Sequence, residues 1–132
     1  MFIMTEQSTI DHINEMSGTK LVLVKDQFSH FDAQDSNYIV EIKNRRKYYP
    51  EKMIEAIKLY NNERTAQIYG KKFLYVVTDP KGFYVYNVTN LMDQIVRLPM
   101  IALKSPKTTD FIKKDKLDKW SYVLPETLAI KL

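Results

Sequence analysis

The sequence contains no cysteine and only three glycines and two histidines among its 132 residues. The absence of cysteine excludes disulfides, thiolate catalysis and cysteine-based zinc sites. Neither GxGxxG nor GxxxxGK[ST] occurs, so a glycine-rich phosphate-binding loop is excluded as well. Because His12 and His30 are the only histidines, a bound metal is expected to be a hard cation such as Mg²⁺ or Mn²⁺ on carboxylate oxygens.

Long hydrophobic runs are also missing, since no apolar stretch approaches the roughly 18 residues that a membrane span requires. The first ten residues, MFIMTEQSTI, lack the basic and hydrophobic regions of a signal peptide, so we expect a cytoplasmic protein. The chain is 45% hydrophobic and 12% aromatic, which favours one folded domain over residues 1–132. A net charge of +4 slightly favours an anionic partner.

The apolar pattern predicts an α/β domain with a mixed central sheet flanked by helices. The element order is α-β-β-α-β-β, followed by a short helix and a C-terminal strand. The expected helices cover 5–16, 50–70 and 91–98, and the expected strands lie in 20–32, 38–43, 71–79, 82–90 and 119–126. We expect turns at 33–37 and 79–82, the first of which closes an antiparallel hairpin.

The helical and strand periodicities also predict where several side chains lie. In the first helix, Glu6 falls on the face of Ile10 and Ile13, unless Ser8 is the N-cap and leaves Glu6 outside the helix. The second helix is expected to bury apolar positions at helical spacing, which are Met53, Ile54, Ile57, Tyr60 and Ile68. Sheet packing explains the aromatic residues at 73, 75, 83, 84 and 86 better than base stacking does, and Trp120 is expected in the core.

The segment YIVEIKNRRKYY, residues 38–49, places two charges in a strand that is otherwise apolar. Successive strand residues face opposite sides, so Glu41 and Lys43 share one face and Val40 and Ile42 the other. The predicted hairpin brings Asp32 close to Glu41. Two such carboxylates suit a divalent cation, which polarises a phosphoryl oxygen and activates water, and a nearby lysine orients that water. This pattern favours phosphodiester hydrolysis.

Asp32, Glu41-Ile42-Lys43 and an acid on a preceding helix resemble the D…ExK signature of the PD-(D/E)XK nuclease superfamily, which includes restriction endonucleases and Holliday junction resolvases. The α-β-β-α-β order is similar too. The resemblance implies a restriction-endonuclease-like fold, with Asp32 and Glu41 as metal ligands and Lys43 beside the attacking water. It also implies that Glu6 supports the site. The phrase YIVEIKNR is typical of phage-encoded members, for which the compartment would be the host cytoplasm.

In this superfamily the second helix often carries a polar residue that reaches the active site, and Lys58 fits that role, with Lys52 as a rival. Arg45, Arg46 and Lys47 are expected to contact phosphates. The resemblance therefore implies a Mg²⁺- or Mn²⁺-dependent DNA endonuclease. A chain without a separate recognition domain favours DNA structure over DNA sequence as the target. We expect a homodimer, because duplex DNA has two strands to cut.

Alternatives remain open at this point. The chain could be a non-catalytic nuclease-fold module that binds or inhibits a protein or nucleic-acid partner, or a structural phage protein with a chance motif. Glu41 and Lys43 could form a surface ion pair, and Asp35 competes with Asp32. His30 could carry protons or only pack in the strand. The lysine-rich stretch 104–119 could follow a nucleic-acid backbone or only add solubility.

Overall fold

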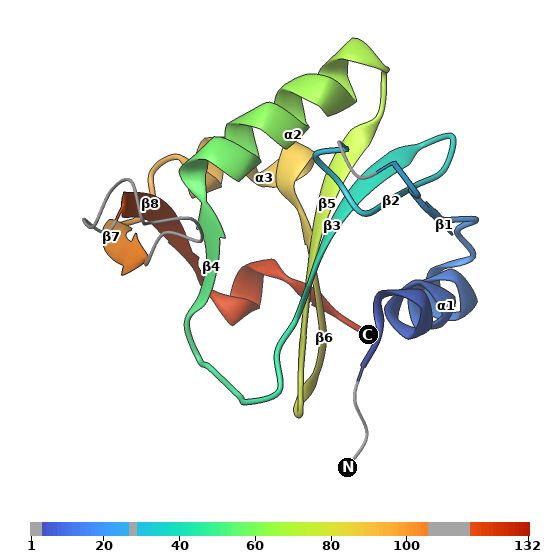
Figure 1. Cartoon of the computed structure of the whole chain (residues 1–132), viewed down its shortest axis with the longest axis horizontal. Coiled ribbons are helices and arrows are strands. Elements are labelled where there is room, and N and C mark those ends of the chain that lie inside the picture. The colour runs from blue at the N-terminus through green and yellow to red at the C-terminus, as the bar shows by residue number, and fades with distance from the viewer. Residues whose placement is uncertain (1–3, 27–28, 106–116) are drawn as a thin grey trace, which may run out of the picture.

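The structure, a computed structural model, describes residues 4–26, 29–105 and 117–132. Figure 1 shows a central sheet with helices on both sides. The helices are α1 (Glu6–Ser17), α2 (Ala56–Ile68), α3 (Val88–Ile95) and a 3₁₀ turn, η1 (Glu126–Leu128). The strands are β1 (Val22–Leu23), β2 (Ala33–Gln34), β3 (Tyr38–Asn44), β4 (Lys52–Glu55), β5 (Lys72–Asp79), β6 (Gly82–Asn87), β7 (Met100–Ser105), β8 (Leu117–Leu124) and β9 (Ile130–Lys131).

The larger sheet has the strand order β1-β2-β3-β5-β6-β9. Its central pair, β3 and β5, is parallel, whereas every other neighbouring pair is antiparallel. A parallel pair needs a long crossover connection, which β4 and α2 provide. The expected fold class, a mixed central sheet flanked by helices, is therefore confirmed.

The alternation predicted for β3 determines which helix each of its side chains meets. Val40 and Ile42 pack with Ile10 and Ile13 of α1 in one apolar cluster. Ile39 packs in a second cluster, with the buried residues of α2, α3 and the small sheet. Glu41 and Lys43 share the face of Ile39, so they point toward the side of the sheet that α2 covers.

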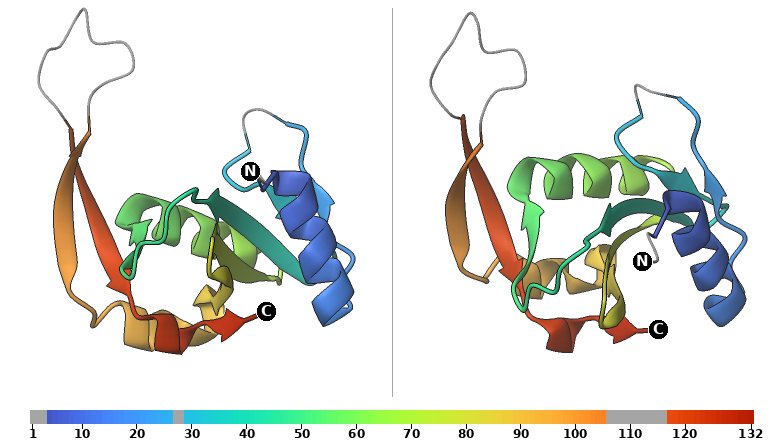
Figure 2. Two further views of the ribbon diagram at one scale, coloured as in Figure 1. Left: turned by 90° about the horizontal axis from the view of Figure 1, so that it is seen from below. Right: turned by 60° about the horizontal axis from the view of Figure 1, so that its bottom comes forward.

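A smaller sheet, in the order β4-β8-β7, lies beside the N-terminal end of α2. Figure 2 shows β7 and β8 as a paired arm at the opposite end of the molecule from α1. Trp120 lies on this arm with 56% of its surface exposed, so its expected place in the core is wrong. By contrast, Phe73, Tyr75, Tyr84 and Tyr86 are buried as sheet packing predicts.

The predicted helix over 50–70 begins too early, because its first residues form strand β4. Lys52 and Ile54 are buried and Met53 and Glu55 are partly exposed, which is strand alternation. The hydrogen bonds of β4 come from β8, with Lys52 opposite Leu124. A partner so far along the chain cannot be inferred from local periodicity.

The inward face of α2 also differs from the predicted one. Ile57, Tyr60 and Ile68 are 68%, 47% and 69% exposed. The buried face consists of Leu59, Asn62, Glu63 and Ala66. Two of these four are polar, so a search for apolar spacing selects the wrong side of the helix.

The N-terminal hairpin is present but its turn is shorter than expected. Ala33 and Gln34 form β2 and pair with β3, and Asp35 closes the turn by accepting hydrogen bonds from the backbone N–H groups of Asn37 and Tyr38 at 2.7 and 2.8 Å. Helix α3 also begins three residues earlier than the predicted 91–98 segment.

The remaining expectations concern the helix cap, the membrane and the lysine-rich stretch. Thr5, not Ser8, is the N-cap of α1, and the helix ends at its C-cap Gly18, which has a positive φ. None of the helices in the described ranges is long and apolar enough to cross a membrane. Most of the lysine-rich stretch 104–119 lies outside the described residues.

Candidate active site

The β2–β3 hairpin positions Asp32 against the strand that carries Glu41. Ala33 lies opposite Val40, so the next pair in the antiparallel register is Asp32 and Glu41. The backbone N–H of Asp32 donates to the Val40 carbonyl at 2.8 Å. Its Oδ2 accepts from the Ile42 N–H at 2.7 Å. Asp32 is therefore held by backbone contacts on both its main chain and its side chain.

Glu41 lies in the middle of the central sheet, next to Tyr75 of β5. It is only 7% exposed, which is unusual for a glutamate. Its Oε2 lies 3.5 Å from Nζ of Lys58, whose side chain is 41% exposed. At this distance and exposure the pair is a loose ion pair, and it leaves oxygens of Glu41 open to a further ligand.

Asp32 and Glu41 line one pocket of about 300 Å³, whose other lining residues are Ser29, His30, Lys58, Asn61 and Asn62. Asp32 and Glu41 thus border the same open pocket. His30 is exposed and lies in the loop before β2 rather than in the strand, but it still borders this pocket. Asp35 is occupied in its turn and does not line the pocket.

The electrostatics of the pocket disfavour two negative charges. Burial raises the pKa of Glu41, and the nearby charge of Asp32 raises it further. Lys58 and Lys43 act in the opposite direction without reversing the shift. A cation placed between two partly desolvated carboxylates would relieve this repulsion.

Lys43 lies two residues along the same strand face, in a neighbouring pocket of about 200 Å³ that Glu41 and Lys58 also line. Burial lowers the pKa of Lys43, and the cations of Lys58 and Arg45 lower it further. A lysine of this kind releases or accepts a proton more readily than an exposed lysine does. Glu41 and Lys58 connect the two pockets because they border both.

Glu6 does not join the two carboxylates. It is the first residue of α1, it is exposed, and it lines neither pocket. Partial burial and the charge of Asp32 raise its pKa, so it lies within electrostatic reach of Asp32. Among the described residues no group of three or more His, Cys, Asp or Glu side chains could hold a metal.

The basic residues after β3 are all exposed. Arg45, Arg46 and Lys47 form the start of the loop that leaves the strand. Arg45 borders both the Lys43 pocket and a wide groove of about 800 Å³, to which Arg46 and Lys81 also contribute. A row of cations therefore continues from the candidate site into this groove.

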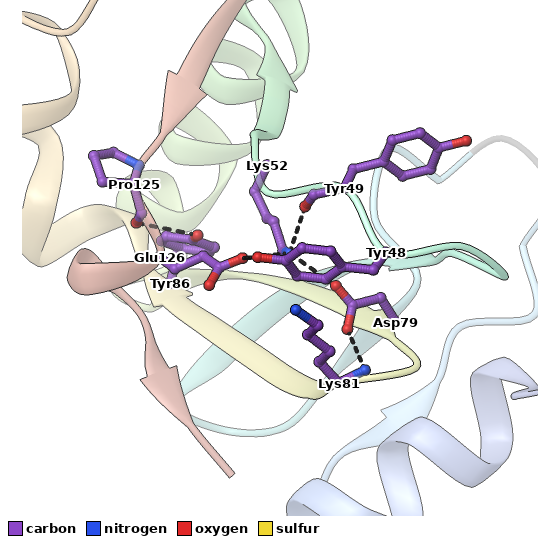
Figure 3. Close-up of polar contacts among 8 residues, drawn as sticks. All are labelled: Tyr48, Tyr49, Lys52, Asp79, Lys81, Tyr86, Pro125 and Glu126. Atoms are coloured by element: carbon purple, nitrogen blue, oxygen red, sulfur yellow. Dashed lines mark hydrogen bonds and ion pairs between the residues drawn. The ribbon is translucent and has the colours of Figure 1, made fainter.

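Lys52, the rival of Lys58, lies in a different polar cluster, which we call the Lys52 cluster: Tyr48, Lys52, Asp79, Tyr84 and Glu126. Figure 3 shows the ammonium group of Lys52 surrounded by acceptors. It donates to the Tyr49 carbonyl at 2.6 Å, to Asp79 at 2.8 Å and to Glu126 at 2.7 Å. It also lies over the rings of Tyr48 and Tyr84, at 4.4 and 4.2 Å from their centroids.

The ammonium group of Lys52 is saturated, because it has three donors and all three are used. The Lys52 cluster joins the start of β4, the end of β5 and η1. Tyr48 adds a hydrogen bond to Glu126 at 2.9 Å. These contacts hold Lys52 in place and leave it no role in the Glu41 pocket.

Ser29, Asn61 and Asn62 line the pocket although nothing in the sequence pointed to them, and of the three only Asn62 is buried. It is 1% exposed, and within the described part of the chain neither its Oδ1 nor its Nδ2 has a hydrogen-bond partner. It follows Lys58 by one helical turn, and residues four apart share a helix face. Once Lys58 is selected, that spacing is the signal that points to Asn62.

Comparison of the sequence with protein-family models and with curated proteins gives no match. The structure is similar to a Holliday junction resolvase, Hjc, from the archaeal hyperthermophile Archaeoglobus fulgidus, with a TM-score of 0.53 and 14% identity. The similarity covers 92% of this chain and 93% of the resolvase. The chain therefore has a restriction-endonuclease-like fold.

Proposed function

We propose that this protein is a divalent-metal-dependent DNA endonuclease that recognises the structure of its substrate. The observation that carries the proposal is the shared pocket of Asp32 and Glu41, with Lys43 two residues further on the same strand face. The fold of a Holliday junction resolvase adds support for branched DNA as the substrate class. A homodimer is the expected assembly, since such a substrate has two strands to cut.

The residues present suit Mg²⁺ or Mn²⁺ through their hard oxygens. Asp32 and Glu41 would hold the cation. When bound, the cation would polarise the scissile phosphate and lower the pKa of a water molecule. The backbone contacts of Asp32 fix one carboxylate, and the burial of Glu41 keeps bulk water from the other.

Lys43 would act on the attacking water or on the charge that develops at phosphate. Its lowered pKa suits proton transfer near neutral pH better than that of an exposed lysine. Lys58 would give up its loose contact with Glu41 when substrate and cation bind. Arg45, Arg46 and Lys47 would bind the phosphates that flank the cut.

Cleavage of a four-way DNA junction, a linear duplex and a single strand with Mg²⁺, Mn²⁺ or EDTA tests the proposal. We expect metal-dependent cutting of the junction and a loss of at least about 100-fold in Lys43→Ala. Lys72→Ala is the matched control, because Lys72 is an exposed lysine at the start of β5 and lines neither pocket. It should cut like the wild type.

One observation favours the non-catalytic alternative, namely the absence of a three-carboxylate group among the described residues. Under this alternative the folded protein would bind branched DNA or a protein partner without cutting. Equal junction binding with and without metal, and no product with any substrate, would therefore contradict the nuclease proposal and favour the binding module.

A further inference from the structure

Asn62 occupies a position in α2 where its side chain ought to be apolar. It lies between Leu59 and Ala66 on the buried face of the helix. An amide that is buried without hydrogen bonds lowers stability, because water no longer solvates it and nothing replaces that water. Such a group needs an explanation other than packing.

The other buried polar residue of this face has such an explanation. Glu63 accepts hydrogen bonds from Gln67 at 2.9 Å and from Thr89 at 2.5 Å, so it joins α2 to α3. Asn62 has no equivalent contact and borders the pocket of Asp32 and Glu41 instead. The residue with the unsatisfied amide is therefore part of the wall of the pocket that Asp32 and Glu41 line.

We propose that Asn62 supplies an amide oxygen to a divalent cation held by Asp32 and Glu41. Amide oxygens are ordinary ligands of hard cations, either directly or through water. A neutral third ligand suits this pocket, because a third carboxylate would add to the repulsion that already raises the pKa of Glu41. The inference rests on the proposed metal-dependent function and adds a residue that the D…ExK motif does not contain.

The test uses metal-free protein and Mn²⁺ alone, so that no cleavage is needed. Thermal unfolding measures stability, and the electron paramagnetic resonance signal of free Mn²⁺ measures binding. Asn62→Leu removes the amide and keeps the same branched arrangement of side-chain heavy atoms. We expect its melting temperature to rise by about 3 °C or more and its Mn²⁺ affinity to fall about tenfold or more.

Asn62→Asp is the second variant and should show the opposite pattern. A third carboxylate is expected to lower the melting temperature of the metal-free protein, while Mn²⁺ binding is kept or becomes tighter. Gln94→Leu is the control for an amide-to-leucine change, because Gln94 is exposed on α3 and lines none of the pockets described above. It should change neither quantity.

Binding of Mn²⁺ by Asn62→Leu as tightly as by the wild type would overturn the inference and leave the proposed nuclease standing. A lower melting temperature in Asn62→Leu together with weak Mn²⁺ binding by Asn62→Asp would make Asn62 a structural residue and also overturn it. A wild type that binds no Mn²⁺ would contradict the metal-dependent function itself, and the inference with it.

Discussion

Two buried charged clusters on this small fold use their lysines and carboxylates in opposite ways. In the Lys52 cluster the ammonium group has three acceptors within 2.8 Å and two aromatic faces. In the pocket of Asp32 and Glu41 the nearest lysine stands 3.5 Å from Glu41, and Asn62 has no partner in the described structure. The ammonium group of the first cluster has no donor left for a ligand, whereas the second cluster has donors and acceptors to spare.

The pKa shifts reflect the same difference. In the Lys52 cluster, burial alone would lower the pKa of Lys52, but the hydrogen bonds and charges of Asp79 and Glu126 outweigh it and raise the pKa. The hydrogen bond from Lys52 lowers the pKa of Glu126, so both charged forms are stabilised. In the candidate site, burial raises the pKa of Glu41 and lowers that of Lys43, so both charged forms are disfavoured. Stabilised charges support the fold, and disfavoured charges are typical of functional sites.

The largest effect on stability is expected when Lys52, the central residue of the Lys52 cluster, is replaced. Lys52→Met would leave Asp79, whose side chain is 1% exposed, buried without its cation. Breaking a buried ion pair from one side costs about 3–5 kcal/mol, which urea unfolding would measure. Lys72→Met, at an exposed lysine at the start of β5, should cost far less. Similar losses in both variants would remove the distinction between a structural and a surface lysine.

The sequence was informative where structure depends on near neighbours. Strand alternation placed Glu41 and Lys43 on one face, and the short hairpin brought Asp32 opposite Glu41. Prediction from the sequence failed where pairing with a strand far along the chain determines the structure. The pairing of β4 with β8 makes residues 52–55 a strand, and the buried face of α2 includes two polar residues that apolar spacing does not select. Asn62 was missed for that reason, since it stands on the face that apolar spacing did not select.

The affinity for DNA should distinguish the basic residues beside the candidate site from basic residues elsewhere on the protein. If Arg45 and Arg46 bind phosphates beside the candidate site, then Arg45→Ala/Arg46→Ala should weaken binding to uncut junction DNA. It should also reduce the slope of log K against log salt by about 2. Lys72→Ala is the control, because Lys72 is exposed at the start of β5, donates to Asn90 at 2.9 Å and does not line the groove of Arg45 and Arg46. An equal change in the salt-dependence slope of that variant would contradict a DNA path along Arg45 and Arg46.

The smallest effect on stability is expected from a change of pH, which acts through the carboxylate of Glu126 in the Lys52 cluster. The pKa of Glu126 is lowered in the folded protein, first by the hydrogen bond from Lys52. The stability it adds is therefore present above its unfolded pKa, near 4.5, and is lost as the pH falls through the lower folded value. Lys52 has a raised pKa, so its contribution is complete below about 10.5.

Thermal unfolding between pH 3 and 8 would measure this loss. We expect the fall in melting temperature on acidification to be smaller in Glu126→Gln than in the wild type, since the variant lacks the titrating group. A variant that loses stability as steeply as the wild type would show that Glu126 does not contribute to acid sensitivity.

The most direct measurement makes the same carboxylate-to-amide change in both clusters and follows melting temperature and junction cleavage with Mg²⁺ in parallel. Glu41→Gln should melt at a higher temperature than the wild type at pH 7 and lose cleavage, because a disfavoured charge is removed from the proposed metal site. Glu126→Gln should melt lower and keep cleavage. If Glu41→Gln still cuts, or if Glu126→Gln abolishes cutting while remaining folded, the division between a structural and a catalytic cluster is contradicted.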